Sequence, residues 1–147
     1  LKEYAKYFPC EKSEKLALKT VNVLVFLMDI KIVSKNPLKI TPHKPCHEDF
    51  DFISIIKSIE NAEYEEAEDF DKCCGFSGKF ALKNLEISRK IAKSKAEKFI
   101  NTNADLIITT CPACELGIRQ GLIEIDKKSR IPVMNLVEFI SEFCDIY

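Results

Sequence analysis

Five of the seven cysteines in this chain fall into three short clusters that any fold must accommodate. Cys46 stands alone, Cys73 and Cys74 are adjacent, and two residues separate Cys111 from Cys114. Neighbouring side chains diverge from the backbone, so Cys73 and Cys74 cannot both point into one apolar core. The tandem pair therefore indicates a chemical role, and the three clusters together predict a metal or iron–sulfur site.

The length and composition are typical of one globular domain. The chain has 147 residues, of which 46% are apolar, and its net charge of −1 provides no field for nucleic acid or an acidic membrane. The longest apolar run, Val23 to Met28, is far too short to span a bilayer. An odd number of cysteines fits a disulfide scaffold poorly. We therefore expect reduced thiols in the cytoplasm, with any contact to the inner face of the membrane made through a complex.

Hydrophobic periodicity predicts helices that alternate with short apolar strands. The clearest strand covers 106–110, and the most regular helix covers 80–101. The segment 13–32 is predicted as a helix, although its run Val23–Phe26 also suits a strand, and Asn36-Pro37 breaks the pattern. The other predicted helices cover 49–60, 112–126 and 136–143, and the other predicted strands cover 38–41, 63–67 and 131–134.

This alternation predicts an α/β fold, a small parallel sheet of about four strands flanked by helices in Rossmann-like layers. Residues 1–35 are expected to form a helical lead-in packed on a cysteine-rich domain of residues 36–147. Because the chain begins with Leu1 rather than methionine, we expect a longer parent polypeptide. Ligands of open α/β sheets bind beyond the carboxyl ends of the strands. Each cysteine cluster follows a predicted strand, so the clusters should meet at one edge of the sheet.

Local chemistry around the clusters favours thiolates. Pro112 suits the first position of a helix and Cys111 its N-cap, where free N–H groups and the helix dipole lower a thiol pKa. Cys114 lies on the same helical face and can reach the same ion. Gly75 and Gly78 allow the backbone to approach closely and to donate N–H bonds to sulfur.

The residue types leave three functions open, because thiolates bind zinc and iron–sulfur clusters alike. Structural zinc sites commonly use two CxxC-like pairs, whereas this chain has one CxxC and a surplus thiol, which favours an iron–sulfur site. A structural zinc-binding or interaction domain is the first alternative. The second is a thiol–disulfide redox site in which Cys73-Cys74, or Cys111 with Cys114, cycles between reduced and oxidised forms.

The remaining candidates have simpler interpretations. Cys10 and Cys144 lie outside the clusters and are expected to pack in the core. His47 could donate a hydrogen bond to sulfur or bind zinc, but a capping or surface role suits it equally well, as it suits His43. The lysines of the predicted helix 80–101 are expected to form a solvated face.

Three segments together resemble a known family. The sequences P-C-H at 45–47, C-C-G-F-S-G at 73–78 and C-P-A-C at 111–114 are similar to the motifs of the cysteine-rich CCG domain. This domain occurs in the cysteine-rich subunit of heterodisulfide reductase and in the iron–sulfur subunits of glycolate oxidase, lactate-utilisation enzymes and anaerobic glycerol-3-phosphate dehydrogenase. The chain most resembles the second, C-terminal copy of the glycolate oxidase and lactate-utilisation type.

The resemblance implies an iron–sulfur cluster of the 4Fe–4S type, non-cubane in some members, held by Cys46, Cys73, Cys74, Cys111 and Cys114. It implies electron transfer within a flavin-linked oxidoreductase that oxidises a 2-hydroxyacid or glycerol-3-phosphate, or that acts on a heterodisulfide. The expected partners are a flavin-containing dehydrogenase subunit and the rest of the parent chain, with no nucleic acid and no membrane span. The domain alone is not expected to turn over substrate, and an isolated fragment can lose its cluster in air.

Overall fold

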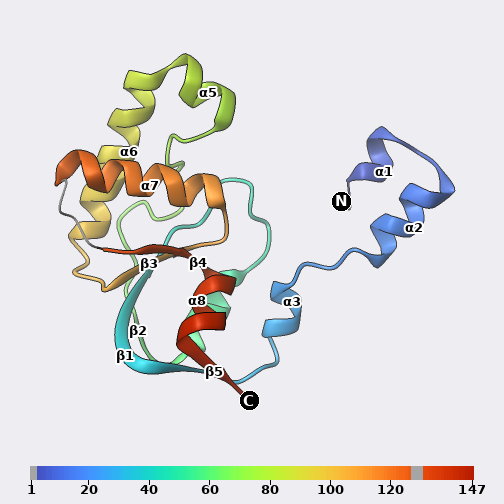
Figure 1. The fold of residues 1–147 in the computed structure, drawn as a ribbon, viewed down its shortest axis with the longest axis horizontal. Helices are drawn as coiled ribbons and strands as arrows, with labels where there is room; N and C mark the ends of the chain where they lie inside the picture. The colour runs from blue at the N-terminus through green and yellow to red at the C-terminus, as the bar shows by residue number, and fades with distance from the viewer. Residues whose placement is uncertain (1–2, 127–130) are drawn as a thin grey trace. The chain divides into compact units, whose positions relative to one another are not determined.

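The computed structural model describes residues 3–126 and 131–147. Leu1 and Lys2, which belong to the predicted lead-in, and residues 127–130 of the predicted domain lie outside this part. The chain divides into two compact units, Leu1–Ile30 and Lys31–Tyr147. The described residues of the first unit form three short helices, α1 (Tyr4–Tyr7), α2 (Glu11–Lys19) and α3 (Leu24–Leu27) (Figure 1).

The single helix predicted over 13–32 is wrong, because the chain leaves helical geometry between α2 and α3. Thr20 ends α2 with extended backbone angles, and the β-branched Val21 and Val23 favour extended conformations. The Asn22 side chain then accepts a hydrogen bond of 3.1 Å from the Leu24 N–H. Such local side-chain bonds compete with a continuous helix, so a new turn starts here.

The second unit contains the sheet and its covering helices (Figure 1). None of the described helices is long and apolar enough to cross a bilayer. The elements of this unit, in chain order, are β1 (Ile32–Pro42), α4 (Phe52–Lys57), β2 (Glu60–Tyr64), α5 (Gly78–Lys83), α6 (Leu85–Ile100), β3 (Leu106–Thr109), α7 (Pro112–Ile125), β4 (Val133–Asn135), α8 (Leu136–Phe143) and β5 (Cys144–Ile146).

Parallel strands form the sheet in the order β2-β1-β3-β4, which confirms the predicted α/β fold. β5 adds an antiparallel strand that pairs Ile146 with Ile32 of β1. β5 has only three residues, too few to show a hydrophobic periodicity, so this strand was not predicted from the sequence. The chain crosses from one side of β1 to the other on its way from β2 to β3. The space beyond the carboxyl ends of β1 and β3 is therefore the switch point at which open α/β sheets bind ligands.

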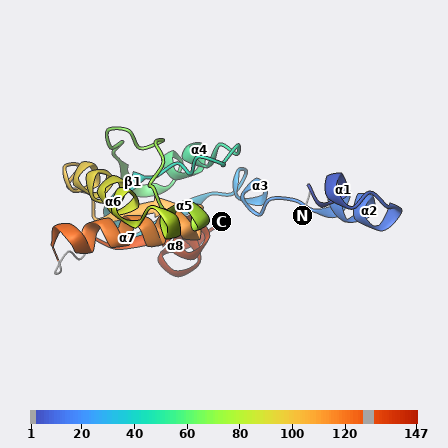
Figure 2. The same cartoon turned by 90° about the horizontal axis from the view of Figure 1, so that it is seen from above.

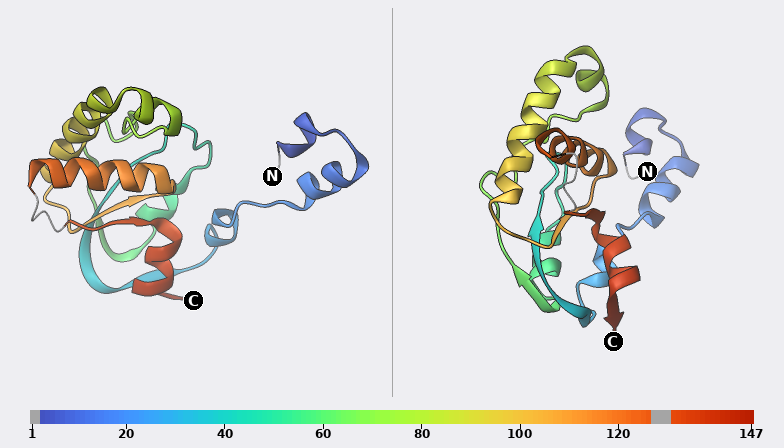
Figure 3. Two further views of the ribbon diagram at one scale, coloured as in Figure 1. Left: turned by 45° about the horizontal axis from the view of Figure 1, so that its top comes forward. Right: turned by 60° about the vertical axis from the view of Figure 1, so that its left-hand side comes forward.

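β1 is longer than the predicted strand over 38–41, because it continues back through Asn36 and Pro37 (Figure 3). Its pairing with β2 changes register between Val33 and Leu38. An irregularity of this kind is one of the few places where proline fits in a sheet, since its missing N–H then interrupts no ladder bond. β1 can therefore serve as the strand that pairs with β2, β3 and β5.

Helices α6 and α7 lie side by side against the sheet (Figure 2). They approach closely because Gly121 of α7 faces the backbone of Ala92 on α6, where a Cβ on Gly121 would lie 2.1 Å from the carbonyl oxygen. This packing holds the first turn of α7 in place beside β3. The buried residues between these helices and the sheet include Phe99, Ile107, Ile118, Leu122 and Val133.

The helix predicted over 80–101 divides at Asn84 into α5 and α6. Lys95 of α6 also departs from the predicted solvated face, since only 4% of its surface is exposed. Its Nζ donates a hydrogen bond to the carbonyl oxygen of Asp69, and burial lowers the pKa of Lys95 to about 8. This contact attaches α6 to the loop that leads to Cys73.

The start of α8 depends on Asn135, whose Oδ1 accepts a hydrogen bond of 3.0 Å from the Val137 N–H. We expect Asn135→Ala to lower the free energy of unfolding by about 1 kcal/mol, because this N–H loses its partner. Urea denaturation of the metal-free chain measures the change. Glu142→Ala, at the other end of α8, is the control, and an equal loss in both variants would contradict the capping role.

Candidate metal centre

Loops at the carboxyl ends of β1, β2 and β3 bring the three cysteine clusters together. Cys46 follows β1, Cys73 and Cys74 follow β2, and Cys111 and Cys114 follow β3 at the start of α7. All five cysteines line one pocket of about 200 Å³. The predicted meeting of the clusters at one edge of the sheet is therefore confirmed, whereas their role as ligands stays a prediction.

Packing against α6 shapes the loop that carries the tandem pair. Gly75 has a φ of 77°, and a Cβ at this position would lie 2.8 Å from the Cβ of Ile91. The Ser88 hydroxyl of α6 donates a hydrogen bond of 2.8 Å to the Gly75 carbonyl. The glycine after Cys74 is thus required both by its left-handed backbone and by the close approach of α6.

Helix α7 approaches the same loop from another direction. Cys111 is its N-cap and Pro112 its first residue, as predicted. Further along α7, a Cβ on Gly117 would lie 2.4 Å from the Cβ of Phe76 and 3.5 Å from the Cys74 sulfur. A glycine at this position therefore lets the first turns of α7 lie directly against Cys74.

Hydrogen bonds link the loops that carry the cysteines. Thr110, in the loop after β3, donates a hydrogen bond of 2.9 Å to the Glu48 carboxylate in the loop after β1. The Lys44 N–H, also in the loop after β1, donates a bond of 3.0 Å to the Phe70 carbonyl in the loop after β2. All three cysteine-bearing loops are therefore linked to one another by hydrogen bonds.

The five sulfur atoms differ in their exposure to solvent. Cys74 and Cys114 are buried, Cys111 is half-buried, and Cys46 and Cys73 are exposed. The site therefore has one end that water does not reach and one end that faces solvent.

Cys74 and Cys114 influence each other's ionisation at the buried end. The Cys114 thiol donates a hydrogen bond to the Cys74 sulfur, which lowers the pKa of Cys74 to about 4 although burial acts in the opposite direction. The Phe76 N–H reinforces this effect. The same contact, together with burial, raises the pKa of Cys114. The lowered pKa of Cys74 favours its thiolate, the form in which cysteine binds metals.

The exposed sulfurs are also neighbours. The Gly75 N–H donates a hydrogen bond of 3.3 Å to the Cys73 sulfur, as expected for a glycine after the tandem pair. Desolvation raises the pKa of Cys46, and the adjacent Cys73 thiol raises it further by a smaller amount. Cys111 in turn lies next to Cys114. Every one of the five sulfurs therefore has another as its neighbour.

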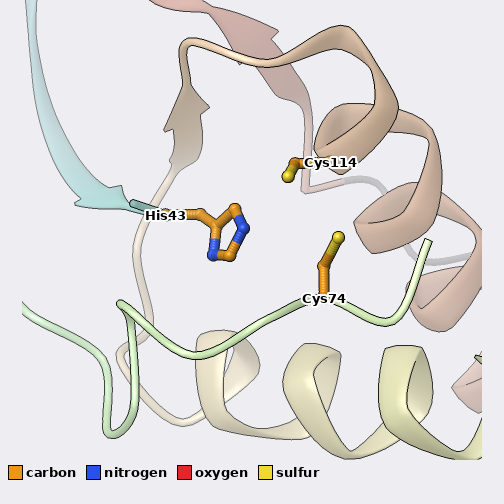
Figure 4. Close-up of side chains that lie close together, drawn as sticks. All are labelled: His43, Cys74 and Cys114. Atoms are coloured by element: carbon orange, nitrogen blue, oxygen red, sulfur yellow. The ribbon is translucent and has the colours of Figure 1, made fainter. Parts of the chain in front are cut away.

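His43 is the nearby donor that the sequence did not single out. It directly follows β1, and one of its ring nitrogens lies within 4.8 Å of the sulfur atoms of Cys74 and Cys114. The ring nitrogen farther from the backbone, Nε2, is the one that points toward them (Figure 4). The ring is fully buried, and its Nδ1 is 2.9 Å from the Phe70 carbonyl. The one sequence signal that could have identified His43 as a site residue is its position just after a predicted strand. His47, which the motif at 45–47 contains, also lines the pocket.

The donor set suits a metal that prefers sulfur. Five thiols and the His47 imidazole line the pocket, and the His43 imidazole lies beside Cys74 and Cys114. Nε2 of His43 has no hydrogen-bond partner among the described residues. Buried polar atoms are normally paired, so an unpaired nitrogen facing thiols fits a site built for a ligand. Zinc and iron–sulfur clusters are the groups that such donors bind.

Cys10 and Cys144 do not line this pocket. Cys144 on β5 is buried, as predicted, and its burial raises its pKa to about 11. Cys10 is exposed rather than in a core, because it forms the N-cap of α2. Its N–H donates a hydrogen bond of 3.0 Å to the Ser13 hydroxyl, and hydrogen bonding to Ser13 lowers the pKa of the Cys10 thiol.

These environments predict different thiol reactivities. We expect iodoacetamide to modify Cys10 at least about 10-fold faster than Cys144 in the folded chain near pH 8, since ionisation and access both favour Cys10. Peptide mass spectrometry measures both rates, and in urea they should converge. Faster modification of Cys144 in the folded chain would contradict these assignments.

Comparison with known proteins places the site in a family. Residues 40–119, more than half of the chain, match the family described as the cysteine-rich domain, CCG. An uncharacterized iron–sulfur protein of Methanococcus maripaludis is 32% identical over 136 residues, which are 84% of this chain and 28% of that protein. One subunit of the CoM/CoB fumarate reductase of Methanothermobacter marburgensis is 34% identical over 118 residues, or 76% of this chain and 24% of the relative.

A further relative is lactate utilization protein A of Halalkalibacterium halodurans, which is 28% identical over 141 residues, or 89% of this chain and 57% of the relative. The chain thus spans about a quarter of the length of the two methanogen proteins. The matched residues include the carboxyl ends of β1 and β3 and all five cysteines of the pocket. The chain belongs to the cysteine-rich CCG domain family, as its three motifs had predicted.

Proposed function

We propose that this chain is an iron–sulfur electron-transfer domain of a larger oxidoreductase. The observation that carries the proposal is the pocket lined by five cysteines at the carboxyl edge of the sheet. The names of the relatives support it, since one is an iron–sulfur protein and another is a subunit of a fumarate reductase. Both features favour a redox role over a purely structural one.

Cys46, Cys73, Cys74, Cys111 and Cys114 would hold a cluster of the 4Fe–4S type, in a cubane or non-cubane form. When bound, such a cluster accepts an electron and passes it on. Five thiols exceed the four ligands that a cubane cluster commonly takes from cysteine. The fifth is available to a non-cubane arrangement.

The residues around the pocket would tune its reduction potential. Burial of Cys74 and Cys114 excludes water from one end, where a low dielectric disfavours added negative charge. The Gly75 N–H withdraws charge from the Cys73 sulfur, and the N-terminus of α7 at Cys111 acts in the same sense. The two N–H effects stabilise the reduced state, and burial opposes them.

Electrons would enter or leave at the exposed end, where Cys46 and Cys73 lie. Cys73 also borders a second pocket, which is lined by several lysines, among them Lys72 and Lys90. A basic surface here favours an acidic partner. The partner that we assign is a flavin-containing dehydrogenase subunit, together with the rest of the parent chain. The substrate, a 2-hydroxyacid such as glycolate or lactate, glycerol-3-phosphate or a heterodisulfide, would bind outside this domain.

Reductive titration of the anaerobically prepared chain tests the proposal. We expect a brown protein whose visible absorption is bleached by dithionite, with an EPR signal that changes on uptake of one electron. A colourless protein that titrates as a two-electron dithiol couple would support the thiol–disulfide alternative and overturn the proposal.

A structural zinc site is the second candidate, and the buried group of His43, Cys74 and Cys114 favours it. Their ligand atoms lie within 4.8 Å of one another, and zinc binds mixed sets of sulfur and nitrogen. This candidate predicts stoichiometric zinc, no visible absorption and unfolding by a chelator.

A further inference from the structure

His43 is held in one orientation by a hydrogen bond on the side of the ring away from the sulfurs. Its Nδ1 lies 2.9 Å from the Phe70 carbonyl oxygen. A carbonyl can only accept a hydrogen bond, so Nδ1 carries the proton and donates it. In the neutral ring, Nε2 then presents a lone pair. The same Phe70 carbonyl also accepts a bond from the Lys44 N–H, which fixes its position.

The lone pair of Nε2 faces the buried sulfurs. The ring is 0% exposed, and Nε2 has no hydrogen-bond partner among the described residues. Nε2 points toward the sulfur atoms of Cys74 and Cys114 (Figure 4), and a ring nitrogen and the two sulfurs lie within 4.8 Å of one another. Phe99 packs against the ring edge-on, with centroids 6.1 Å apart. The imidazole is therefore enclosed and aimed at the thiols.

A histidine that only fills a core does not need this arrangement. Buried polar atoms are normally satisfied, and here one ring nitrogen is satisfied while the other is left open toward two thiols. Histidines that bind metals characteristically donate their other N–H to a backbone carbonyl or a carboxylate, which fixes both tautomer and orientation. The Phe70 carbonyl provides that second contact for His43.

We propose that Nε2 of His43 is a direct metal ligand, which together with the sulfurs of Cys74 and Cys114 holds a metal ion at the buried end of the pocket. The donor set is then mixed, with nitrogen as well as sulfur. Cys74 and Cys114 bind as thiolates, and any thiol proton goes to solvent, whereas Nε2 has no proton to lose. This inference rests on the proposed function only in that the pocket holds a metal.

A nitrogen ligand has a specific electronic consequence. A neutral imidazole in place of a thiolate lowers the negative charge at the metal, and histidine ligation raises the reduction potential of iron–sulfur centres. We therefore expect the potential of the loaded site to fall when His43→Cys supplies a thiolate instead. An unchanged or higher potential in His43→Cys would contradict direct ligation.

Cobalt(II) binding to the full metal-free chain provides the decisive test. The chain has only two histidines, so His47→Asn is a matched control for His43→Asn. With Co²⁺ added anaerobically, we expect thiolate-to-cobalt absorption and one solvent-exchangeable imidazole N–H resonance with a large paramagnetic shift in the proton NMR spectrum. That resonance is the Nδ1–H of His43, and it should be present in the wild type and in His47→Asn but absent from His43→Asn.

The affinity for Co²⁺ provides a second measure. We expect His43→Asn to weaken binding by more than the roughly 10–100-fold that the loss of an outer-shell partner costs, and His47→Asn to change it less than about 3-fold. Circular dichroism establishes that the variants fold. The wild-type spectrum decides the question even if His43→Asn does not fold. A wild-type Co²⁺ complex without a shifted imidazole N–H, or no Co²⁺ binding at all, would overturn the inference.

Reconstitution with iron and sulfide separates this inference from the proposed function. With ¹⁵N-histidine in the chain, pulsed EPR of the reduced centre should show a strong ¹⁵N coupling that His47→Asn retains. A cluster without that coupling would leave the electron-transfer function standing and remove His43 as a ligand. Co²⁺ bound through His43 in a chain that takes up neither iron nor sulfide would support His43 as a metal ligand. The same result would overturn the electron-transfer function.

Discussion

Cys74→Ser is expected to leave the anaerobically prepared chain with less than about a tenth of the wild-type iron, whereas Cys144→Ser retains all of it. Cys74 lies at the centre of the donor set, next to the Cys114 sulfur and the His43 ring. Its lowered pKa favours the thiolate that binds a metal. A serine hydroxyl stays protonated near neutral pH and is a poor ligand for metals that prefer sulfur.

Cys144 provides the matched control for this experiment. It is buried, as Cys74 is, but it lies on β5 and does not line the pocket. Both variants therefore lose a buried thiol, but only Cys74→Ser loses one that lines the pocket. Iron and acid-labile sulfide are measured per folded chain. A full complement of both in Cys74→Ser would remove the tandem pair from the ligand set.

The second large effect is expected for Gly121→Ala, which should lower the free energy of unfolding by about 2–3 kcal/mol. The new Cβ would lie 2.1 Å from the Ala92 carbonyl oxygen and 2.5 Å from its carbon, both of them backbone atoms that no side-chain rotation can move away. Helices α6 and α7 must therefore separate. The better helix propensity of alanine offsets only about 1 kcal/mol of this cost.

Gly78→Ala is the control for that substitution. Nothing lies within 4 Å of a Cβ at Gly78, at the start of α5, so this variant should be close to the wild type in urea denaturation. Because α7 also carries Cys114, separation of the helices should weaken metal binding in Gly121→Ala as well. Equal stability of the two variants would show that α6 and α7 have room to adjust.

Much of the fold could be predicted from the sequence, because its strongest patterns are local. The strand Leu106–Thr109 and the helices Pro112–Ile125 and Leu136–Phe143 lie within a residue of their predicted bounds. Each has a continuous apolar run or a helical stripe, and α7 also has a proline start signal. The parallel arrangement of the strands followed from their alternation with helices.

The errors have tertiary or very local causes. The strand β1 passes through Pro37 because a register shift accommodates it, and this depends on its partner β2. β5 exists only because it pairs with β1. Lys95 is buried because the Asp69 carbonyl accepts a hydrogen bond from its Nζ, a contact between segments far apart in the sequence. Periodicity carries none of this information.

The candidate site, too, could be predicted from the sequence only in part. The cysteines are recognisable by type and spacing, and connectivity was sufficient to place their clusters at one edge of the sheet. His43 could not be distinguished from His47 in the sequence, because both flank Cys46. Only the folded chain shows which ring has one nitrogen bonded to Phe70 and the other facing the sulfurs.

Elemental analysis of the anaerobically purified chain tests the central claim most directly. Iron, acid-labile sulfide and zinc are measured on the same sample, with protein quantified by amino-acid analysis. A 4Fe–4S site predicts about four iron atoms and about four sulfides per chain, with little zinc. One zinc per chain with neither iron nor sulfide would contradict the electron-transfer function and assign the pocket to structural zinc.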